Sequence, residues 1–320
     1  MKIIFMGTPE FAVPSLKALI NSKHKIVAVV TQPDKPVGRS KSLQPSPIKE
    51  LAMENNLQVL QFTKIRTEGV EIIQNLDADI IVTCAFGQIL NAEILFAKKF
   101  GVINVHGSIL PKYRGASPIQ SAIIKGETKT GVSILKSDIG IDDGDVLLIK
   151  ELDILENETY GELSIRLANL GADALLESLE LLESGKAIYT PQKAEEATHC
   201  SMFKSDFGHI TFDNKAQDIV NLINGLNPSP VAFMYVKNFR YKLYNAHIVS
   251  EDKIKELGIN LSQHKIGEVV VAKSKVGLYI KAIDGVVSID KIQAENGKVL
   301  TAKEFLNGGK ILVGDIVDNE

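Results

Sequence analysis

The stretch Gly101–Gln120, GVINVHGSILPKYRGASPIQ, begins as a strand and ends as a loop. Its first residues alternate apolar side chains with Asn104 and His106, and side chains two residues apart on a strand point to the same face. A strand inside a parallel sheet is covered on both faces, so a polar pair there needs a reason. Either residue alone fits a hydrogen-bonded group at a strand end. The pair, followed by Gly107 and a polar loop, indicates a functional site.

An acidic turn follows a second predicted strand, residues 132–135. It reads SDIGIDDGD from Ser137 to Asp145, before another apolar run, residues 146–149. Aspartates between glycines suggest either an ordinary turn or a calcium loop. The EF-hand loop has a different aspartate spacing and lies between two helices. A carboxylate turned toward the strand of Asn104 and His106 is therefore the better interpretation.

The first 31 residues have the pattern strand, turn, helix, strand, with Thr8 as the expected N-cap of the helix. This opening is typical of a doubly wound α/β sheet. The fingerprint G-x-G-x-x-G is missing, since only Gly7 is present, and this excludes a dinucleotide such as NAD. Residues 78–83 predict a central strand. Phe86 and Gly87 follow its carboxyl end, where open α/β sheets bind ligands.

The chain changes character near residue 190. We expect a Rossmann-like α/β domain with a mostly parallel sheet over residues 1–189, and a linker with little periodicity over 190–205. Residues 206–320 contain short strands and glycine turns, which predict a small OB-like β-barrel. From residue 206 onward there are 14 basic and 14 acidic residues. The barrel is therefore not basic as a whole, and any nucleic-acid contact depends on local groups such as those in residues 237–242.

The composition is that of an ordinary globular protein, with 45% hydrophobic and 23% charged residues and a net charge of −3. Two cysteines give neither a disulfide framework nor metal-ligand spacing, which favours the reducing cytoplasm. No apolar run is long enough for a signal peptide or a membrane span. Residues 32–47 contain several prolines and more bases than acids, so we expect an irregular loop that is either functional or simply solvated.

The central stretch, together with DIGIDDGD at residues 138–145, resembles the formyltransferases that use 10-formyltetrahydrofolate. The segments MGTPEFA and QPDKPVGRSK are similar to those of members that formylate methionine on initiator tRNA, and the resemblance covers essentially the whole chain. Some residues depart from the family pattern. Ile109 stands in place of the usual Leu and Asp143 in place of a common Thr. Phe212 and Ser229 stand where Trp is frequent.

The resemblance implies a site and its ligands. The catalytic residues are Asn104, His106 and Asp142. Folate contacts come from two loops: Ser108, Ile109, Leu110 and Pro111, with Phe86 and Gly87. The tRNA contacts fall on basic residues: Arg39, Lys41, Lys112 and Arg114. The co-substrate is 10-formyltetrahydrofolate, and the partner is initiator methionyl-tRNA. From the residues themselves we expect no metal, no NAD, no membrane contact and no obligate protein partner.

Formyl transfer passes through a tetrahedral intermediate with charge on oxygen. Asn104 can donate a hydrogen bond to that oxygen, and His106 can donate another when it is protonated. Asp142 either orients the imidazole or accepts the proton that leaves the amine, directly or through water.

Three alternatives stay open at this point. The same catalytic domain could formylate a small amine such as a nucleotide sugar or glycinamide ribonucleotide. A formyl-folate hydrolase would share the three catalytic residues. A non-catalytic RNA-binding protein would have no need to keep all three.

Overall fold

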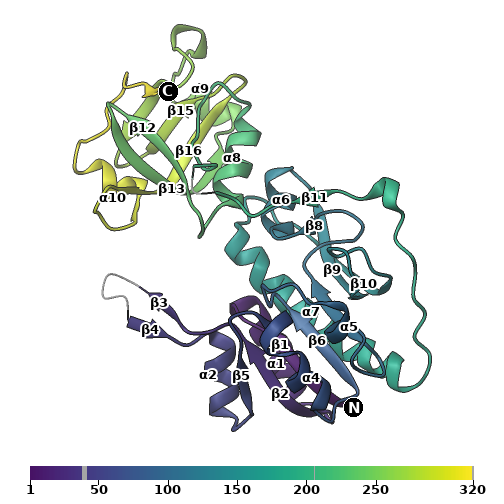
Figure 1. Cartoon of the computed structure of the whole chain (residues 1–320). Coiled ribbons are helices and arrows are strands. Elements are labelled where there is room, and N and C mark those ends of the chain that lie inside the picture. The colour runs from purple at the N-terminus through teal and green to yellow at the C-terminus, as the bar shows by residue number, and fades with distance from the viewer. Residues whose placement is uncertain (38–41, 205, 319–320) are drawn as a thin grey trace. The chain divides into compact units, whose positions relative to one another are not determined.

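The computed structural model describes residues 1–37, 42–204 and 206–318, which form two compact units (Figure 1). The first unit contains Met1–Pro118, Lys129–Leu152 and Ser164–Cys200. The second contains Ile119–Thr128, Asp153–Leu163 and Ser201–Glu320. The division differs from the single boundary expected at residues 190–205, because two short earlier segments pack with the second unit. Residues 190–200 pack with the first unit.

The first unit is built on a seven-stranded sheet in the order β10-β9-β7-β6-β1-β2-β5. Its strands are β1 (Lys2–Gly7), β2 (Lys25–Thr31), β5 (Val59–Gln61), β6 (Ile80–Cys84), β7 (Val102–His106), β9 (Lys129–Lys136) and β10 (Val146–Asp153). Strands β5, β2, β1, β6 and β7 run parallel, and β9 runs antiparallel to β7. The predicted mostly parallel α/β sheet is confirmed.

Helices cover both faces of this sheet. They are η1 (Glu10–Ala12), α1 (Val13–Ile20), α2 (Pro47–Glu54), α3 (Ile65–Glu68), α4 (Val70–Asn75), α5 (Ala92–Leu95) and α7 (Tyr160–Glu183), the last of which belongs to this unit from Ser164 onward. The helix α6 (Pro118–Ile124) belongs to the second unit from Ile119 onward, and its Ile124 packs against the core of that unit. On one face, Ile4 and Met6 pack in a cluster with α4 and α5. On the other, Gly171 of α7 approaches Val105 so closely that an added Cβ would lie 2.9 Å from its Cγ1. The sheet is therefore buried on both sides, as a parallel sheet requires.

Two local predictions in this unit were wrong. Thr8 does not cap a helix, because the 3₁₀ turn η1 comes before α1. The Thr8 hydroxyl instead donates a hydrogen bond to the carbonyl oxygen of Phe86 at 2.9 Å. The segment expected to be irregular contains the antiparallel hairpin β3 (Lys35–Val37) and β4 (Ser42–Gln44). Proline is tolerated in such a hairpin because each strand has one open edge that needs no N–H donor. Arg39 and Lys41, both predicted to contact tRNA, lie outside the described residues.

The second unit contains an antiparallel sheet in the order β14-β15-β16-β13-β12-β18. Its strands are β12 (Ala232–Val236), β13 (Phe239–Ile248), β14 (Val269–Lys273), β15 (Gly277–Lys281), β16 (Val286–Ala294), β17 (Leu300–Thr301) and β18 (Val317–Asp318), and β17 pairs with β16. A bridge between Glu268 and Ile316 joins the chain beside the two edge strands, β14 and β18. The N–H of Val317 also donates to Gly267 at 2.9 Å. This confirms the predicted barrel-like β domain.

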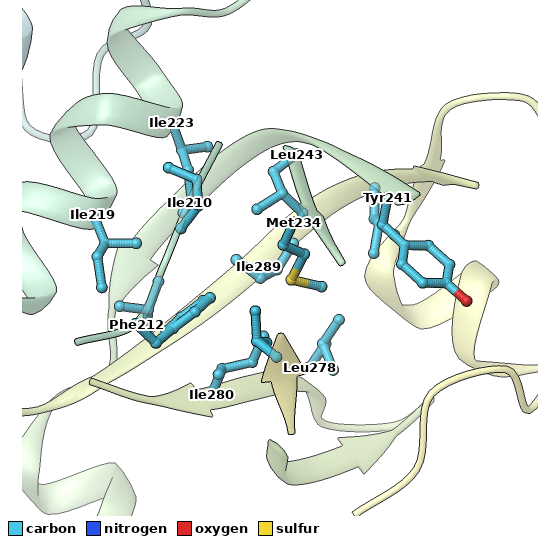
Figure 2. Close-up of a cluster of buried hydrophobic side chains, with 14 of the residues drawn as sticks. Ile210, Phe212, Ile219, Ile223, Met234, Tyr241, Leu243, Leu278, Ile280 and Ile289 are labelled. Carbon is cyan, nitrogen blue, oxygen red and sulfur yellow. The ribbon is translucent and has the colours of Figure 1, made fainter. Parts of the chain in front are cut away.

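An apolar core fills the second unit between its sheet and α8 (Ala216–Gly225) (Figure 2). Phe212 is 0% exposed in this core. The unit also contains α9 (Glu251–Glu256), η3 (Leu261–Gln263) and α10 (Ala302–Leu306). Throughout residues 1–37, 42–204 and 206–318, no helix is both long and apolar enough to cross a membrane.

Candidate active site

Asn104 and His106 lie on one face of β7, as the alternation predicted. β7 pairs with β6 through Thr83 opposite Asn104, and with β9 through Ser133 opposite His106. Both polar residues are therefore at the carboxyl end of β7. In doubly wound sheets this end is where ligands bind.

Asp142 reaches this pair from the acidic turn between β9 and β10. Its Oδ1 accepts a hydrogen bond from Asn104 Nδ2 at 3.3 Å. Its Oδ2 accepts from the backbone N–H of Gly115 at 2.9 Å and lies 3.5 Å from His106 Nδ1. The structure thus brings the three predicted catalytic residues together around one largely buried carboxylate.

Thr83, which the sequence analysis did not select, contacts the Asn104 amide on the side away from Asp142. Its hydroxyl donates to Asn104 Oδ1 at 2.9 Å. An ionised carboxylate only accepts hydrogen bonds, so the NH₂ group of Asn104 must face Asp142 and its oxygen must face Thr83. The available signal was a polar residue near the carboxyl end of the otherwise apolar strand β6.

Both ring nitrogens of His106 face acceptors of the protein itself. Nε2 lies 2.9 Å from the carbonyl oxygen of Tyr113. A carbonyl only accepts, so Nε2 carries a hydrogen in this contact. Nδ1 faces the Asp142 carboxylate, and that contact is attractive when Nδ1 also carries a hydrogen. The ring is therefore placed between a neutral and an anionic acceptor.

The predicted folate loop after β7 is folded inward at two of its four residues. The Ser108 hydroxyl donates to the carbonyl oxygen of Lys112 at 2.6 Å, and the Ser108 carbonyl accepts from Ser133 Oγ at 2.7 Å. The Leu110 side chain packs in a small buried apolar cluster. Ile109 and Pro111 are only partly buried. The Ser108 and Leu110 side chains thus support the turn, and a folate contact for any of the four stays a prediction.

A pocket of about 280 Å³ lies beside this turn. Leu110 and Pro111 form part of its wall, and the rest comes from β10 and from residues 190–196. The pocket lining includes neither Phe86 nor Gly87. Of the two predicted folate loops, only the one after β7 borders this pocket.

Phe86 and Gly87 occupy the loop after β6. The Phe86 side chain is 4% exposed and belongs to the core cluster under the sheet. Its carbonyl oxygen accepts hydrogen bonds from Thr8 and from Gln32 Nε2 at 3.1 Å. Gly87 has a φ of +79°, and an added Cβ would overlap Gln32 Nε2. This loop needs glycine because of its backbone and its close neighbour, and its folate role stays a prediction.

The two described basic residues that were predicted to contact tRNA differ in exposure. Lys112 is exposed. Arg114 is only 8% exposed, and its Nε and Nη2 donate to Gln192 Oε1 at 3.1 and 2.9 Å. The folded chain thus gives Arg114 a structural contact with Gln192, and its predicted tRNA contact stays a prediction. The sequence shows that a guanidinium is present but not that the folded chain encloses it.

The remaining short elements of this region join residues 190–200 to the loop after β7. These elements are β8 (Arg114–Gly115), η2 (Ala194–Glu196) and β11 (His199–Cys200), and β11 pairs in parallel with β8. The Tyr113 N–H donates to Thr198 Oγ1 at 2.8 Å. Among the residues with described positions, no group of three or more His, Cys, Asp or Glu side chains could hold a metal ion.

Comparisons with known proteins cover nearly the whole chain. Residues 1–179 match the formyl transferase family model, and residues 202–310 match the model of the formyl transferase C-terminal domain. A methionyl-tRNA formyltransferase from Clostridioides difficile is 43% identical over 98% of this chain and 99% of its own length.

Two solved structures share the fold. The sugar 3N-formyl transferase WlaRD, solved with dTDP and 5-N-formyl-THF, has a TM-score of 0.68 at 22% identity, over 93% of this chain and 99% of WlaRD. HypX from Aquifex aeolicus, solved with tetrahydrofolic acid, has a TM-score of 0.63 at 19% identity, over 96% of this chain. The chain spans about half of HypX, 47% of its length. Taken with the full-length similarity above, the chain belongs to the methionyl-tRNA formyltransferase family, whose formyl donor is a formyl-tetrahydrofolate.

Proposed function

We propose that this chain moves the formyl group of 10-formyltetrahydrofolate to the α-amino group of methionine on initiator tRNA, using Asn104, His106 and Asp142. One observation carries the proposal. An amide, an imidazole and a carboxylate from two separate segments meet at the carboxyl end of β7. Acyl transfer to an amine needs a hydrogen-bond donor for the developing oxyanion and a group that accepts or relays a proton.

The reaction forms one C–N bond and breaks another. The amine nitrogen attacks the formyl carbon, and the carbonyl oxygen takes up negative charge. The oxyanion then collapses, the bond from carbon to the folate nitrogen breaks, and that nitrogen takes up one proton. The amine loses one proton, so the transfer is balanced. An ordinary α-amino group has a pKa of about 7.7 to 8.0, so a useful fraction is already neutral at pH 7.

Asn104 is the best-placed donor for the oxyanion. Its amide carries two hydrogens, of which one is directed at Asp142 Oδ1. The second can therefore bond the formyl oxygen without breaking the contact to Asp142. The bond from Thr83 holds the amide in this orientation before the substrate arrives. A donor fixed in advance stabilises the transition state by about 3 kcal/mol.

His106 and Asp142 act as a pair in the proton steps. Both nitrogens of His106 already face protein acceptors. Donation by His106 to the oxyanion would require one of these contacts to open. The arrangement supports the alternative in which Asp142 receives the amine proton, directly or through water, while His106 and Gly115 stabilise its charge.

A local surface of the second unit supports tRNA as the acceptor. Phe233 and Tyr235 alternate on β12, and Lys242 and Arg240 lie opposite them on β13. Phe233 is buried, and the Arg240 guanidinium lies over its ring, 3.8 Å from the ring centre. The accessible groups of this face are therefore Lys242, with the partly buried Tyr235 and Arg240. Cationic side chains bind the nucleic-acid backbone, and accessible aromatic rings stack on bases. We propose that this hairpin face contacts the tRNA.

The assay is incubation with 10-formyltetrahydrofolate and one of three acceptors: charged initiator tRNA, free methionine, or an amino sugar nucleotide. We expect formyl-methionine on the tRNA and little product from the two small amines. Formylation of the sugar alone would favour the small-amine alternative. Release of formate alone would favour the hydrolase, and no product of any kind would favour the RNA-binding protein.

A further inference from the structure

The segment expected to be a linker supplies a side chain to the back of the catalytic turn. Gln192 Nε2 donates to the carbonyl oxygens of Asp142 at 2.8 Å and Gly144 at 2.7 Å. Its Oε1 accepts both bonds from Arg114. Gln192 and Asp142 are 50 residues apart in the sequence. These contacts therefore form only when the folded chain brings residues 190–200 next to the turn of Asp142.

The chemistry of the partners determines how this amide is turned. A guanidinium only donates and a carbonyl only accepts, so the oxygen of Gln192 must face Arg114 and its NH₂ group must face the turn. Two bonds on each side then satisfy the amide. Arg114, in turn, is buried and needs an acceptor. The side-chain amide of Gln192 is therefore held by Arg114 on one side and by the turn on the other.

The turn that Gln192 holds is in an unfavourable conformation. Asp142 has a φ of +52°, a region that residues other than glycine seldom adopt without external support. An added Cβ on Gly144 would overlap the carbonyl oxygen of Lys136, so the backbone is also crowded there. The two bonds from Gln192 fall on residues 142 and 144, on either side of Asp143. They hold the backbone that aims the Asp142 carboxylate at Asn104 and His106.

The same segment also supports the partner of His106. Tyr113 donates its N–H to Thr198 Oγ1, and its carbonyl oxygen accepts from His106 Nε2. Residues 190–200 thus touch both the turn of Asp142 and the loop that orients the imidazole.

We propose that Gln192, held by Arg114, is a positioning residue for Asp142. This inference rests on the proposed function, because it assigns Gln192 a role only through the Asp142 carboxylate. Gln192 touches no reacting atom. It keeps the carboxylate in the place from which it acts, and residues 190–200 are therefore a part of the catalytic unit.

The test is a double-mutant cycle between Gln192→Met and Asp142→Asn, measured as formylation of charged initiator tRNA. Met matches Gln in length but has no N–H donors. A small displacement of a catalytic group lowers turnover by about 10- to 100-fold, so we expect that loss in kcat for Gln192→Met alone. Both KM values should stay within about threefold, since substrate contacts are intact. Lys186→Met, at an exposed position outside residues 190–200, should match the unmodified enzyme.

The background variant separates positioning from general stability. When Asp142→Asn has already removed the carboxylate, adding Gln192→Met should lower kcat by less than about a further threefold. The effects of substituting two residues that act through one group are not additive. Full multiplication of the two losses would overturn the inference and leave the proposed function standing. Unchanged kcat in Gln192→Met would do the same. Absence of formylation by the unmodified enzyme would overturn both.

Gln192→Glu provides the second variant. Its carboxylate keeps the bonds to Arg114 but repels the two carbonyl oxygens of the turn. It should therefore fold and show the same loss, confined to the background that retains Asp142. If neither variant folds, Gln192 is a stability residue and the positioning role is wrong.

Discussion

In the first unit, buried polar side chains from distant segments meet at the end of β7, whereas the centre of the second unit is apolar. Asn104, Asp142 and Thr83 each depend on a partner in another segment. In the second unit, Phe212 and its neighbours are apolar side chains that pack against one another. A hydrogen-bonded cluster needs every donor matched to an acceptor, while an apolar core tolerates swaps that conserve volume. The catalytic cluster is therefore expected to fail through lost chemistry, and the barrel through lost stability.

The largest free-energy change is expected in the second unit. Phe212→Ala removes a fully buried ring and should lower the free energy of unfolding by about 3–5 kcal/mol. Urea unfolding followed by circular dichroism measures this change. Phe239→Ala removes a ring that is 64% exposed and should cost less than about 1 kcal/mol. Equal losses in the two variants would contradict the assigned core.

The next effect lies in the catalytic cluster and should leave the fold intact. Asp142→Asn keeps the size of the side chain but removes its charge and points an NH₂ group at existing donors. We expect kcat for charged tRNA to fall by about 100-fold or more. Asp173→Asn, at an exposed position of α7, is the matched control and should keep normal turnover. If Asp142→Asn retained normal kcat, Asp142 would have no part in the chemistry.

The smallest effect is expected on the surface of the second unit. Replacing both Arg240 and Lys242 with Ala should raise the KM for tRNA several-fold and reduce the salt slope of log affinity by about one to two. The KM for the folate donor should not change. Kinetics over a salt series measure both quantities. A salt dependence equal to that of the unmodified enzyme would exclude this hairpin from the tRNA contact.

Sequence periodicity predicted the features that depend on the order of neighbouring residues, namely the strands and the faces of their side chains. The alternation in β7 placed Asn104 and His106 on one face, and apolar runs predicted the central strands. The position of Asp142 came from the family resemblance, since its contacts depend on a left-handed turn that no pattern announces. Thr83 and Gln192 were missed because each acts through a partner that is distant in sequence.

Residue type alone does not tell how deeply a side chain is buried. Arg114 was expected to contact tRNA, which stays a prediction, and nothing in the sequence showed that its guanidinium is enclosed by the protein and bonded to Gln192. The prolines of residues 32–47 suggested an irregular loop, although a two-stranded hairpin accommodates Pro36. Enclosure and strand pairing are properties of the folded chain, so neither could be read from composition.

The most direct test of the account is the single-turnover rate of Asn104→Ala with saturating 10-formyltetrahydrofolate and charged initiator tRNA. This measurement isolates the chemical step from binding. The account predicts that the rate falls by about 100-fold or more, while a folate analogue binds within about threefold of its normal affinity. A folded variant whose chemical step stays within about threefold of the unmodified enzyme would contradict the oxyanion role of Asn104.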